Sequence, residues 1–121
     1  MIKGVKFVSL PVRDQKQAVQ FWTEKVGLRI LTDQPFDDKQ RWIELAAPGN
    51  STSVVLFQMD GWDERIGKAM NVVFYADDVE RTYKELSGRG VEFLQPPKKE
   101  GWGTSAVFKD QDGTQFVLSS R

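Results

Sequence analysis

One pattern of residues occurs twice in the chain. Residues 7–30 (FVSLPVRDQKQAVQFWTEKVGLRI) and 71–94 (NVVFYADDVERTYKELSGRGVEFL) each predict a strand, a capped helix, a glycine turn and a second strand. When Asp14 is aligned with Asp78 the first strands coincide, and a slip of one residue in the helices places Gly27 opposite Gly90. A repeat unit of about 60 residues is longer than solenoid periods and suits a duplicated small module. The chain is therefore predicted to fold as a pseudo-symmetric pair.

The first half is predicted to run strand, helix and three strands. Asp14 caps the helix, Gly27 ends it, and the helix buries an apolar stripe of Ala18, Val19, Trp22 and Val26. A loop is expected at 33–40, and a turn is built on Pro48, Gly49 and Asn50. The strands are expected at residues 6–12, 28–32, 41–46 and 53–58.

The second half repeats this order after a linker at residues 59–69. Asp77 or Asp78 caps its helix, and a strand over 91–94 is expected to stop at Pro96-Pro97. Two further strands, at 104–109 and 115–119, flank the segment DQDGT (110–114), which superficially suggests a calcium loop. The oxygen ligands that an EF-hand requires do not follow, so this segment is predicted to be a hairpin turn.

Composition excludes several classes of function. Seventeen basic and 17 acidic residues balance, so no overall charge favours nucleic acid or an anionic membrane as a partner. The chain has no cysteine and no histidine, which removes disulfides, thiolate sites and the usual general base. Its apolar runs are too short to span a membrane, and the 121 residues suit one domain. A cytoplasmic protein is expected.

Over essentially its whole length the chain resembles the vicinal oxygen chelate superfamily, which contains glyoxalases, bleomycin-resistance proteins and extradiol dioxygenases. The resemblance lies in SLPVRDQKQAVQFWTEKVGLRI, RWIELAAPG, VVFYADDVERTYKELSGRGVEF and WGTSAVFKDQDGTQFVL. It implies an α+β fold in which two tandem βαβββ modules form curled mixed sheets around a cleft. A single domain, 1–121, would then contain module one (about 1–60) and module two (about 68–121). Many relatives of this size are homodimers, so a homodimer is expected too.

Active members of that superfamily hold a divalent metal in the cleft through four positions, usually His, Gln or Glu. Transferred to this chain, the four positions fall on Phe7, Leu56, Asn71 and Val117. Three of these side chains are hydrocarbon, and one carboxamide cannot replace a set of oxygen and nitrogen donors. We therefore expect no metal and no other cofactor, unless a slip of one residue in a strand hides the ligands.

If those four positions face the cleft, the period of a strand sends Ser9, Val73 and Tyr75 to the same side. Trp42 and Glu44 are expected there too, with Ile43 and Leu45 in the core. Glu44 is the one candidate catalytic residue, as a general base or a hydrogen-bond acceptor. The alternative is a solvent-facing glutamate that pairs with Arg41 or a neighbouring lysine.

Flat aromatic side chains form the second signal for a binding site. Trp42 and Trp102 could stack on a planar ligand, and Trp62 and Phe36 are weaker candidates. Ordinary packing or a dimer interface would explain such residues equally well. The amide of Asn71 could orient a ligand or be a satisfied buried group.

The leading hypothesis is a metal-free small-molecule-binding protein that sequesters a partly aromatic compound. The alternatives are a metal-dependent lyase, isomerase or dioxygenase, a metal-free enzyme that uses Glu44, and a protein with a structural or interaction role. The predicted ligand-binding residues are Phe7, Ser9, Trp42, Glu44, Leu56, Asn71, Tyr75, Trp102 and Val117.

Overall fold

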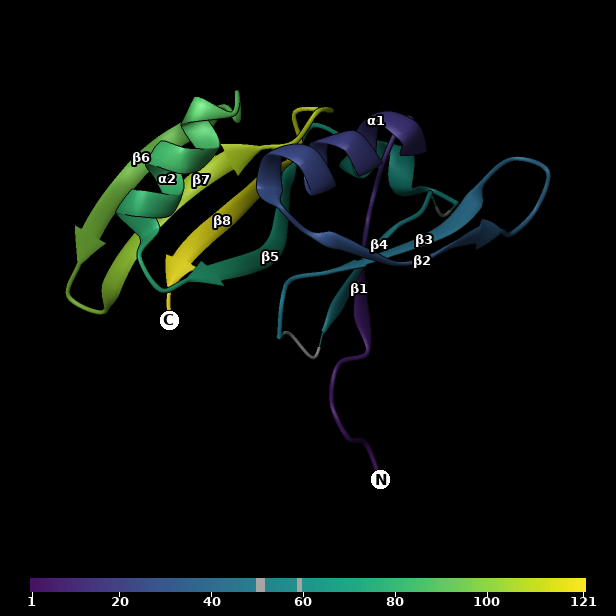
Figure 1. Cartoon of the computed structure of the whole chain (residues 1–121), viewed down its shortest axis with the longest axis horizontal. Helices are drawn as coiled ribbons and strands as arrows, with labels where there is room; N and C mark the ends of the chain where they lie inside the picture. The colour runs from purple at the N-terminus through teal and green to yellow at the C-terminus, as the bar shows by residue number, and fades with distance from the viewer. Residues whose placement is uncertain (50–51, 59) are drawn as a thin grey trace. The chain divides into compact units, whose positions relative to one another are not determined.

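The repeated sequence pattern folds as two units with the same topology. The computed structural model describes residues 1–49, 52–58 and 60–121, which divide into a first unit, residues 1–66, and a second, residues 67–121. Each unit holds one four-stranded mixed sheet, ordered β1-β4-β3-β2 in the first and β5-β8-β7-β6 in the second. The prediction of an α+β fold built from two tandem βαβββ modules is confirmed (Figure 1).

Module one pairs its first and last strands in parallel and its other neighbours antiparallel. Gln15 fastens the helix to the sheet, because its side-chain amide donates to the carbonyl oxygens of Arg41 (2.7 Å) and Leu56 (2.8 Å). The elements of this module are β1 (Phe7–Leu10), α1 (Gln15–Gln20), η1 (Phe21–Val26), β2 (Arg29–Pro35), β3 (Arg41–Ala46), β4 (Ser53–Leu56) and η2 (Trp62–Arg65).

The helix of module one changes its winding halfway along. Asp14 caps α1 by accepting from the N–H groups of Lys16 and Gln17, as predicted, and Gly27 ends the helical segment with φ at 95°. The second half, η1, is a π-helix, whose wider turns rotate the side chains away from α-helical spacing. Phe21 is buried beside Trp22 although the predicted stripe omitted it; it follows buried Ala18 by three positions, a spacing that places both on one side of a helix.

The predicted end of the second strand in module one is wrong. β2 runs on to Pro35, into the predicted loop at 33–40, because β3 supplies partners for it: Asp33 lies opposite Ile43 and Gln34 opposite Trp42. A proline is tolerated there because β2 is an edge strand. Asn50 of the predicted turn lies outside the described residues.

Module two repeats the plan without the π-helix. Asp78, rather than Asp77, is the cap, and its carboxylate accepts from the N–H of Arg81. The strand predicted to stop at Pro96-Pro97 continues through both prolines, with register shifts on either side of Gln95, again on a sheet edge. The elements are β5 (Ala69–Ala76), α2 (Val79–Gly88), β6 (Phe93–Glu100), β7 (Gly103–Lys109) and β8 (Gln115–Ser120).

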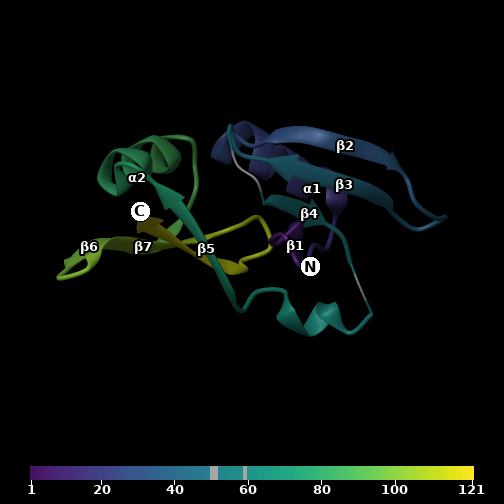
Figure 2. The same ribbon diagram turned by 90° about the horizontal axis from the view of Figure 1, so that it is seen from below.

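Each module has an apolar core between its helix and its sheet, and α2 covers one face of its sheet in both ribbon views (Figures 1 and 2). Leu10, Leu45 and Trp22 are 0% exposed in module one, and Phe116 is 0% exposed in module two. Burial of one such side chain contributes about 1.5 to 3 kcal/mol, so each core is a main source of stability.

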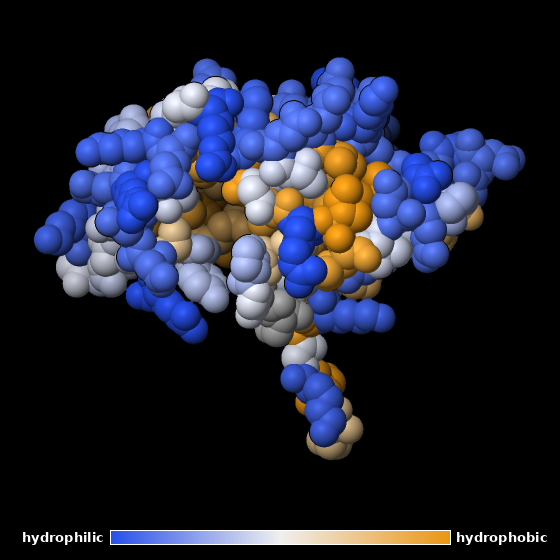
Figure 3. Space-filling view, viewed as in Figure 1, coloured by the Kyte–Doolittle hydropathy of each residue, from blue (hydrophilic) through white to orange (hydrophobic). Residues whose placement is uncertain are grey.

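The N-terminal segment before β1 extends away from the sheet (Figures 1 and 3). It exposes Met1, Ile2 and Val5, and a hydrogen bond joins its end to the rest of the module, since Thr52 donates to the carbonyl oxygen of Val5 at 3.1 Å.

Figure 3 also shows an orange apolar area on the surface of module one, bordered by blue polar side chains. None of the helices described is both long and apolar enough to cross a membrane.

Candidate ligand-binding site

One face of the module-one sheet gathers four of the predicted site residues. Ser9 lies opposite Val55, and Val55 lies opposite Glu44, so these side chains share a face. Side chains alternate between faces along a strand, which adds the residues two positions away. We call this surface the Glu44 face, formed by Phe7, Ser9, Trp42, Glu44, Ser53 and Val55. The opposite, core face carries Ile43, Leu45 and Leu56, each 3% exposed or less.

Four aromatic rings form a connected cluster at one end of the Glu44 face. The Trp42 ring lies 5.4 Å from that of Phe7, centroid to centroid, and 5.2 Å from that of Phe57. Phe36 lies 4.9 Å from Phe57 and 6.2 Å from Trp42, and 59% of it is exposed. These centroid distances are those of interacting aromatic pairs. The cluster thus offers a partly exposed aromatic surface.

Both carboxylate oxygens of Glu44 are held by uncharged donors. The hydroxyl of Ser53 donates to Oε2 at 2.5 Å, and the indole Nε1 of Trp42 donates to Oε1 at 3.4 Å. Glu44 itself is half-buried, and Ser53 is 4% exposed. No lysine or arginine among the described residues lies within 4.0 Å of the carboxylate. The alternative in which Glu44 pairs with Arg41 is therefore wrong: Arg41 contacts Asp33 instead, at 2.6 Å.

The placement of Leu56 on this face is also wrong. Leu56 lies opposite Leu10 in β1, on the core face, and it is 0% exposed. Val55 takes the position beside Ser9 and Glu44. Residues 54–57 (VVLF) form a continuous apolar run, so alternation gave no indication of which residues face the core. For the same reason the sequence did not identify Ser53, Val55 and Phe57 as members of the site.

The second module presents an equivalent face with different chemistry. Val73 lies opposite Val117 and Tyr75 opposite Ser119, whereas Phe74 lies opposite Leu118 in the core. Asn71, Val73 and Tyr75 occupy alternate exposed positions of β5, as predicted. The guanidinium of Arg121 lies 5.0 Å from the centre of the Tyr75 ring. The side of the sheet predicted for Tyr75 and Val117 agrees with the strand register, whereas Asn71 lies within the register shift between Ala69 and Val73. The part of all three in ligand binding stays a prediction.

The residues at the four metal-ligand positions do not fit a divalent ion. Since Leu118 lies opposite Phe74 as Leu56 lies opposite Leu10, the equivalent of Val117 is Val55. The corrected set, Phe7, Val55, Asn71 and Val117, still offers one carboxamide. Within residues 1–49, 52–58 and 60–121, no three His, Cys, Asp or Glu side chains group as metal ligands. The shift of one residue on β4, from Leu56 to Val55, therefore adds no oxygen or nitrogen ligand for a metal.

Two other tryptophans lie away from the sheet faces. Trp102 occupies the turn between β6 and β7, and 67% of it is exposed. Trp62 lies on η2, the short helical turn between β4 and β5 (Figure 2), where the Arg65 guanidinium lies 5.3 Å from its ring. Trp102 lies at the exposed tip of the β6–β7 hairpin. Its role as a ligand contact stays a prediction.

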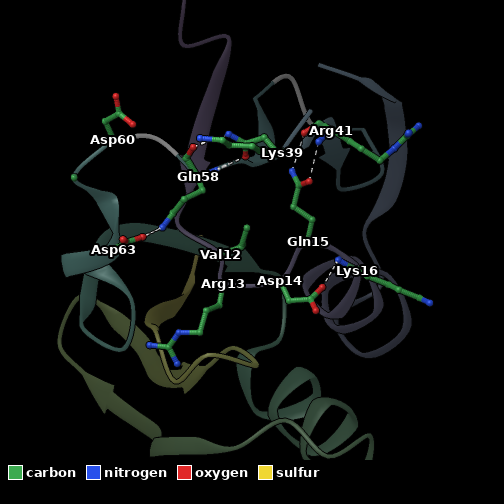
Figure 4. A pocket seen from close by; sticks show the side chains of 12 residues that line it. Val12, Arg13, Asp14, Gln15, Lys16, Lys39, Arg41, Gln58, Asp60 and Asp63 are labelled. Carbon is green, nitrogen blue, oxygen red and sulfur yellow. Dashed lines mark hydrogen bonds between the residues drawn. The ribbon is translucent and has the colours of Figure 1, made fainter. Parts of the chain in front are cut away.

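A polar cavity of about 680 Å³ opens at the edge of module one, where the sequence predicted no site. Its walls are tied together by amides: Gln15 binds the backbone of Arg41, and Gln40 binds the N–H and carbonyl of Gln58 (Figure 4). Gln58 in turn donates to Asp63. The lining residues are Val12, Arg13, Asp14, Gln15, Lys16, Lys39, Gln40, Arg41, Gln58, Asp60, Gly61 and Asp63.

Asp110, in the turn between β7 and β8, is a buried carboxyl that the sequence did not reveal. The turn is the predicted hairpin, closed by the N–H of Asp110 on the Thr114 carbonyl at 2.9 Å. Oδ1 of Asp110 accepts from the N–H groups of Asp112 and Thr114, while Oδ2 finds no partner among the described residues. Burial raises the pKa of Asp110 from 3.8 to about 7, against the effect of those two hydrogen bonds.

Comparison with known proteins agrees with this architecture. A sequence model described as "Glyoxalase/Bleomycin resistance protein/Dioxygenase superfamily" matches residues 4–118. The YetH protein of Bacillus subtilis (strain 168) is 41% identical over 121 residues, which cover 98% of each chain. TnmS3, an antibiotic binding protein from Streptomyces sp. CB03234, superimposes with a TM-score of 0.88 at 34% identity, covering 98% of this chain and 96% of TnmS3. A superfamily member from Sphaerobacter thermophilus DSM 20745 gives the same TM-score at 31% identity, covering 99% and 98%.

Proposed function

The chain belongs to the Glyoxalase/Bleomycin resistance protein/Dioxygenase superfamily, and on that premise we propose that it is a metal-independent binding protein for a small, partly aromatic molecule. Its role would be to sequester or carry that compound rather than to transform it. The binding surface in module one would be the Glu44 face with its aromatic cluster.

The observation that carries this proposal is the pairing of a fixed aromatic cluster with one half-buried polar group. Ligand sites combine mostly apolar and aromatic walls with a few placed polar groups that set orientation. Trp42 belongs to both parts, because its ring contacts Phe7 and Phe57 while its Nε1 donates to Glu44. An apolar ring could stack at the cluster while its polar substituent reaches the carboxylate.

The likeness to TnmS3 supports the same reading. That protein is described as antibiotic binding, and the two chains match over almost their full lengths at 34% identity. Binding of a small organic molecule is what we propose for the Glu44 face. The proposal for this chain is limited to that class of compound.

A direct test is a thermal-shift screen of native protein against neutral compounds of two to four fused rings, with naphthylmethanol as the smallest. Ligands that bind the folded state raise the melting temperature in proportion to the logarithm of their concentration above Kd. Calorimetry on the hits should give one site per chain, with quenching of tryptophan fluorescence. If no compound in the panel binds up to its solubility limit, the proposal fails.

A metal-dependent lyase, isomerase or dioxygenase would need ligands that the four positions do not supply. Metal analysis of protein purified without chelators tests that alternative. One tightly held nickel, zinc, manganese or iron ion per chain would contradict a metal-independent function. Sub-stoichiometric metal that a brief chelator wash removes would agree with it.

A homodimer also belongs to the proposal, as does a cytoplasmic location. Exposed apolar side chains such as Phe36, Ile30 and Leu31 are suitable material for an interface. Light scattering at micromolar concentration should then give twice the 13.8 kDa chain mass. A single species at the chain mass would rule out the dimer and leave the binding proposal intact.

A further inference from the structure

The carboxylate of Glu44 is half-buried, and within residues 1–49, 52–58 and 60–121 no lysine or arginine lies within 4.0 Å of it. Ser53 and Trp42 hold its two oxygens with neutral hydrogen bonds. Arg41, three positions before it on the same strand, lies on the opposite face, where it contacts Asp33. Removal of a carboxylate from water is costly unless an opposite charge or several hydrogen bonds replace the lost solvation. A ligand group that carries positive charge or donates a strong hydrogen bond would therefore be a favourable partner for this carboxylate.

The surrounding rings favour the same kind of partner. The face of an aromatic ring carries negative electrostatic potential and attracts an ammonium or guanidinium group within about 6 Å. Trp42 contacts Phe7 and Phe57 at the edge of the Glu44 face, so a group placed at the carboxylate would also lie near these rings. A ligand with a neutral substituent would gain binding free energy from contact with the rings alone. A ligand with a cationic substituent would gain it from the rings and from the Glu44 carboxylate.

Resting on the proposed function, we propose that Glu44 selects ligands in which a protonated amine or amidine is attached to a flat apolar ring. Ser53 and Trp42 act as positioning residues for the carboxylate. Because both donors are neutral, they orient Glu44 without cancelling its charge. On binding, the ammonium group of the ligand would neutralise the charge of Glu44.

Three probes with one ring system separate the charge effect from the ring effect: naphthylmethylamine, a cation at neutral pH, neutral naphthylmethanol, and the anion naphthylacetate. Native protein should bind the cation at least about tenfold more tightly than the alcohol, as expected for a hydrogen bond to a charged group. The anion should bind more weakly than the alcohol. Added salt should weaken cation binding and leave alcohol binding unchanged.

Glu44→Gln should lower the affinity for the cation about tenfold and change that for the alcohol less than about twofold. Asp33→Asn is the matched control, since it removes the same charge from the opposite face of the same sheet, and it should leave all three affinities unchanged. Circular dichroism and the melting temperature check that both variants fold. If Glu44→Gln fails to fold, the probe ranking and salt dependence of native protein still decide the question.

The outcomes distinguish the two proposals. If native protein binds the alcohol as tightly as the amine, or if Glu44→Gln weakens both equally, the charge selection is wrong and the aromatic binding function stands. If Asp33→Asn weakens the cation as much as Glu44→Gln does, the effect is one of net charge, and Glu44 is not the selecting residue. If none of the three probes binds native protein, both the selection and the aromatic site in module one are wrong.

Discussion

The guanidinium of Arg41 contacts Asp33 at 2.6 Å on one side of the module-one sheet, while Glu44, three residues further along β3, lies on the other side. Odd and even positions of a strand point to opposite faces, so the nearest arginine in sequence cannot neutralise Glu44. Asp33 reaches Arg41 because β2 extends beyond its predicted end and pairs with the start of β3. The extension of β2 thus supplies Arg41 with a carboxylate partner on the face opposite Glu44.

The Trp42 ring should be the main apolar contact for a ligand on the Glu44 face. Trp42→Ala should lower the affinity for a neutral aromatic probe at least about tenfold, because loss of a ring removes both buried area and stacking. Trp62→Ala is the matched control, since Trp62 lies on η2 beside Arg65. Calorimetry at a temperature where both variants are folded measures the difference. Equal losses for the two variants would place the ligand elsewhere.

Leu56 and Val55 should behave differently although both are 0% exposed. Leu56→Ala should lower the free energy of unfolding by about 2 to 5 kcal/mol, because it opens a cavity in the core face. Its effect on probe affinity should be small at temperatures where the variant is folded. Val55→Ala removes less volume, should cost less stability, and should change probe affinity through the Glu44 face. Urea titrations with calorimetry compare the two, and the reverse pattern would contradict the register.

Gly103 should be intolerant of any side chain. Its φ is +147°, and an added Cβ would meet the hydroxyl of Ser120, the same oxygen that accepts from the N–H of Thr104 at 2.9 Å. Gly103→Ala should therefore cost about 1 to 3 kcal/mol of stability. Gly101→Ala, two residues earlier, is the control, because an added Cβ there meets nothing within 4 Å. Chemical denaturation should separate the two variants; equal stability would show that the hairpin adjusts freely.

Asp110 should make the stability of the protein fall as pH rises toward neutrality. Its pKa is raised by burial from 3.8 to about 7, so the folded state keeps a proton that the unfolded state has released. The stabilisation is complete below pH 3.8 and is lost as pH rises through about 7, by at most about 1.4 kcal/mol per pH unit.

Asp110→Asn imitates the protonated carboxyl and can still accept from the N–H groups of Asp112 and Thr114. The stability difference, variant minus native, should grow between pH 4 and pH 7 and then level off. Urea unfolding of both proteins at a series of pH values measures it. A difference that stays constant over this range would show that Asp110 has an ordinary pKa.

The sequence by itself determined the elements whose signals are local. The cap at Asp14, the helix stop at Gly27 and the hairpin before Gln115 each depend on residues within a few positions, and all appear where they were predicted. The second cap was predicted at Asp77 or Asp78, and the structure places it at Asp78. The repeat then fixed the α+β topology, because one βαβββ pattern read twice requires two similar modules. The lack of metal donors also follows from residue types alone, and it survives the correction of Leu56 to Val55.

The tertiary structure decided whatever depends on a partner strand. Neither the apolar run at 54–57 nor the segment through Pro96-Pro97 carries an alternation that identifies its faces or its end, so only the neighbouring strand could fix the register and length. The π-helical winding of η1 was likewise not among the elements predicted from the sequence. The partner of Arg41 depended on the pairing of β2 with β3, because hydrogen bonds between strands, rather than spacing along one strand, place Asp33 beside Arg41.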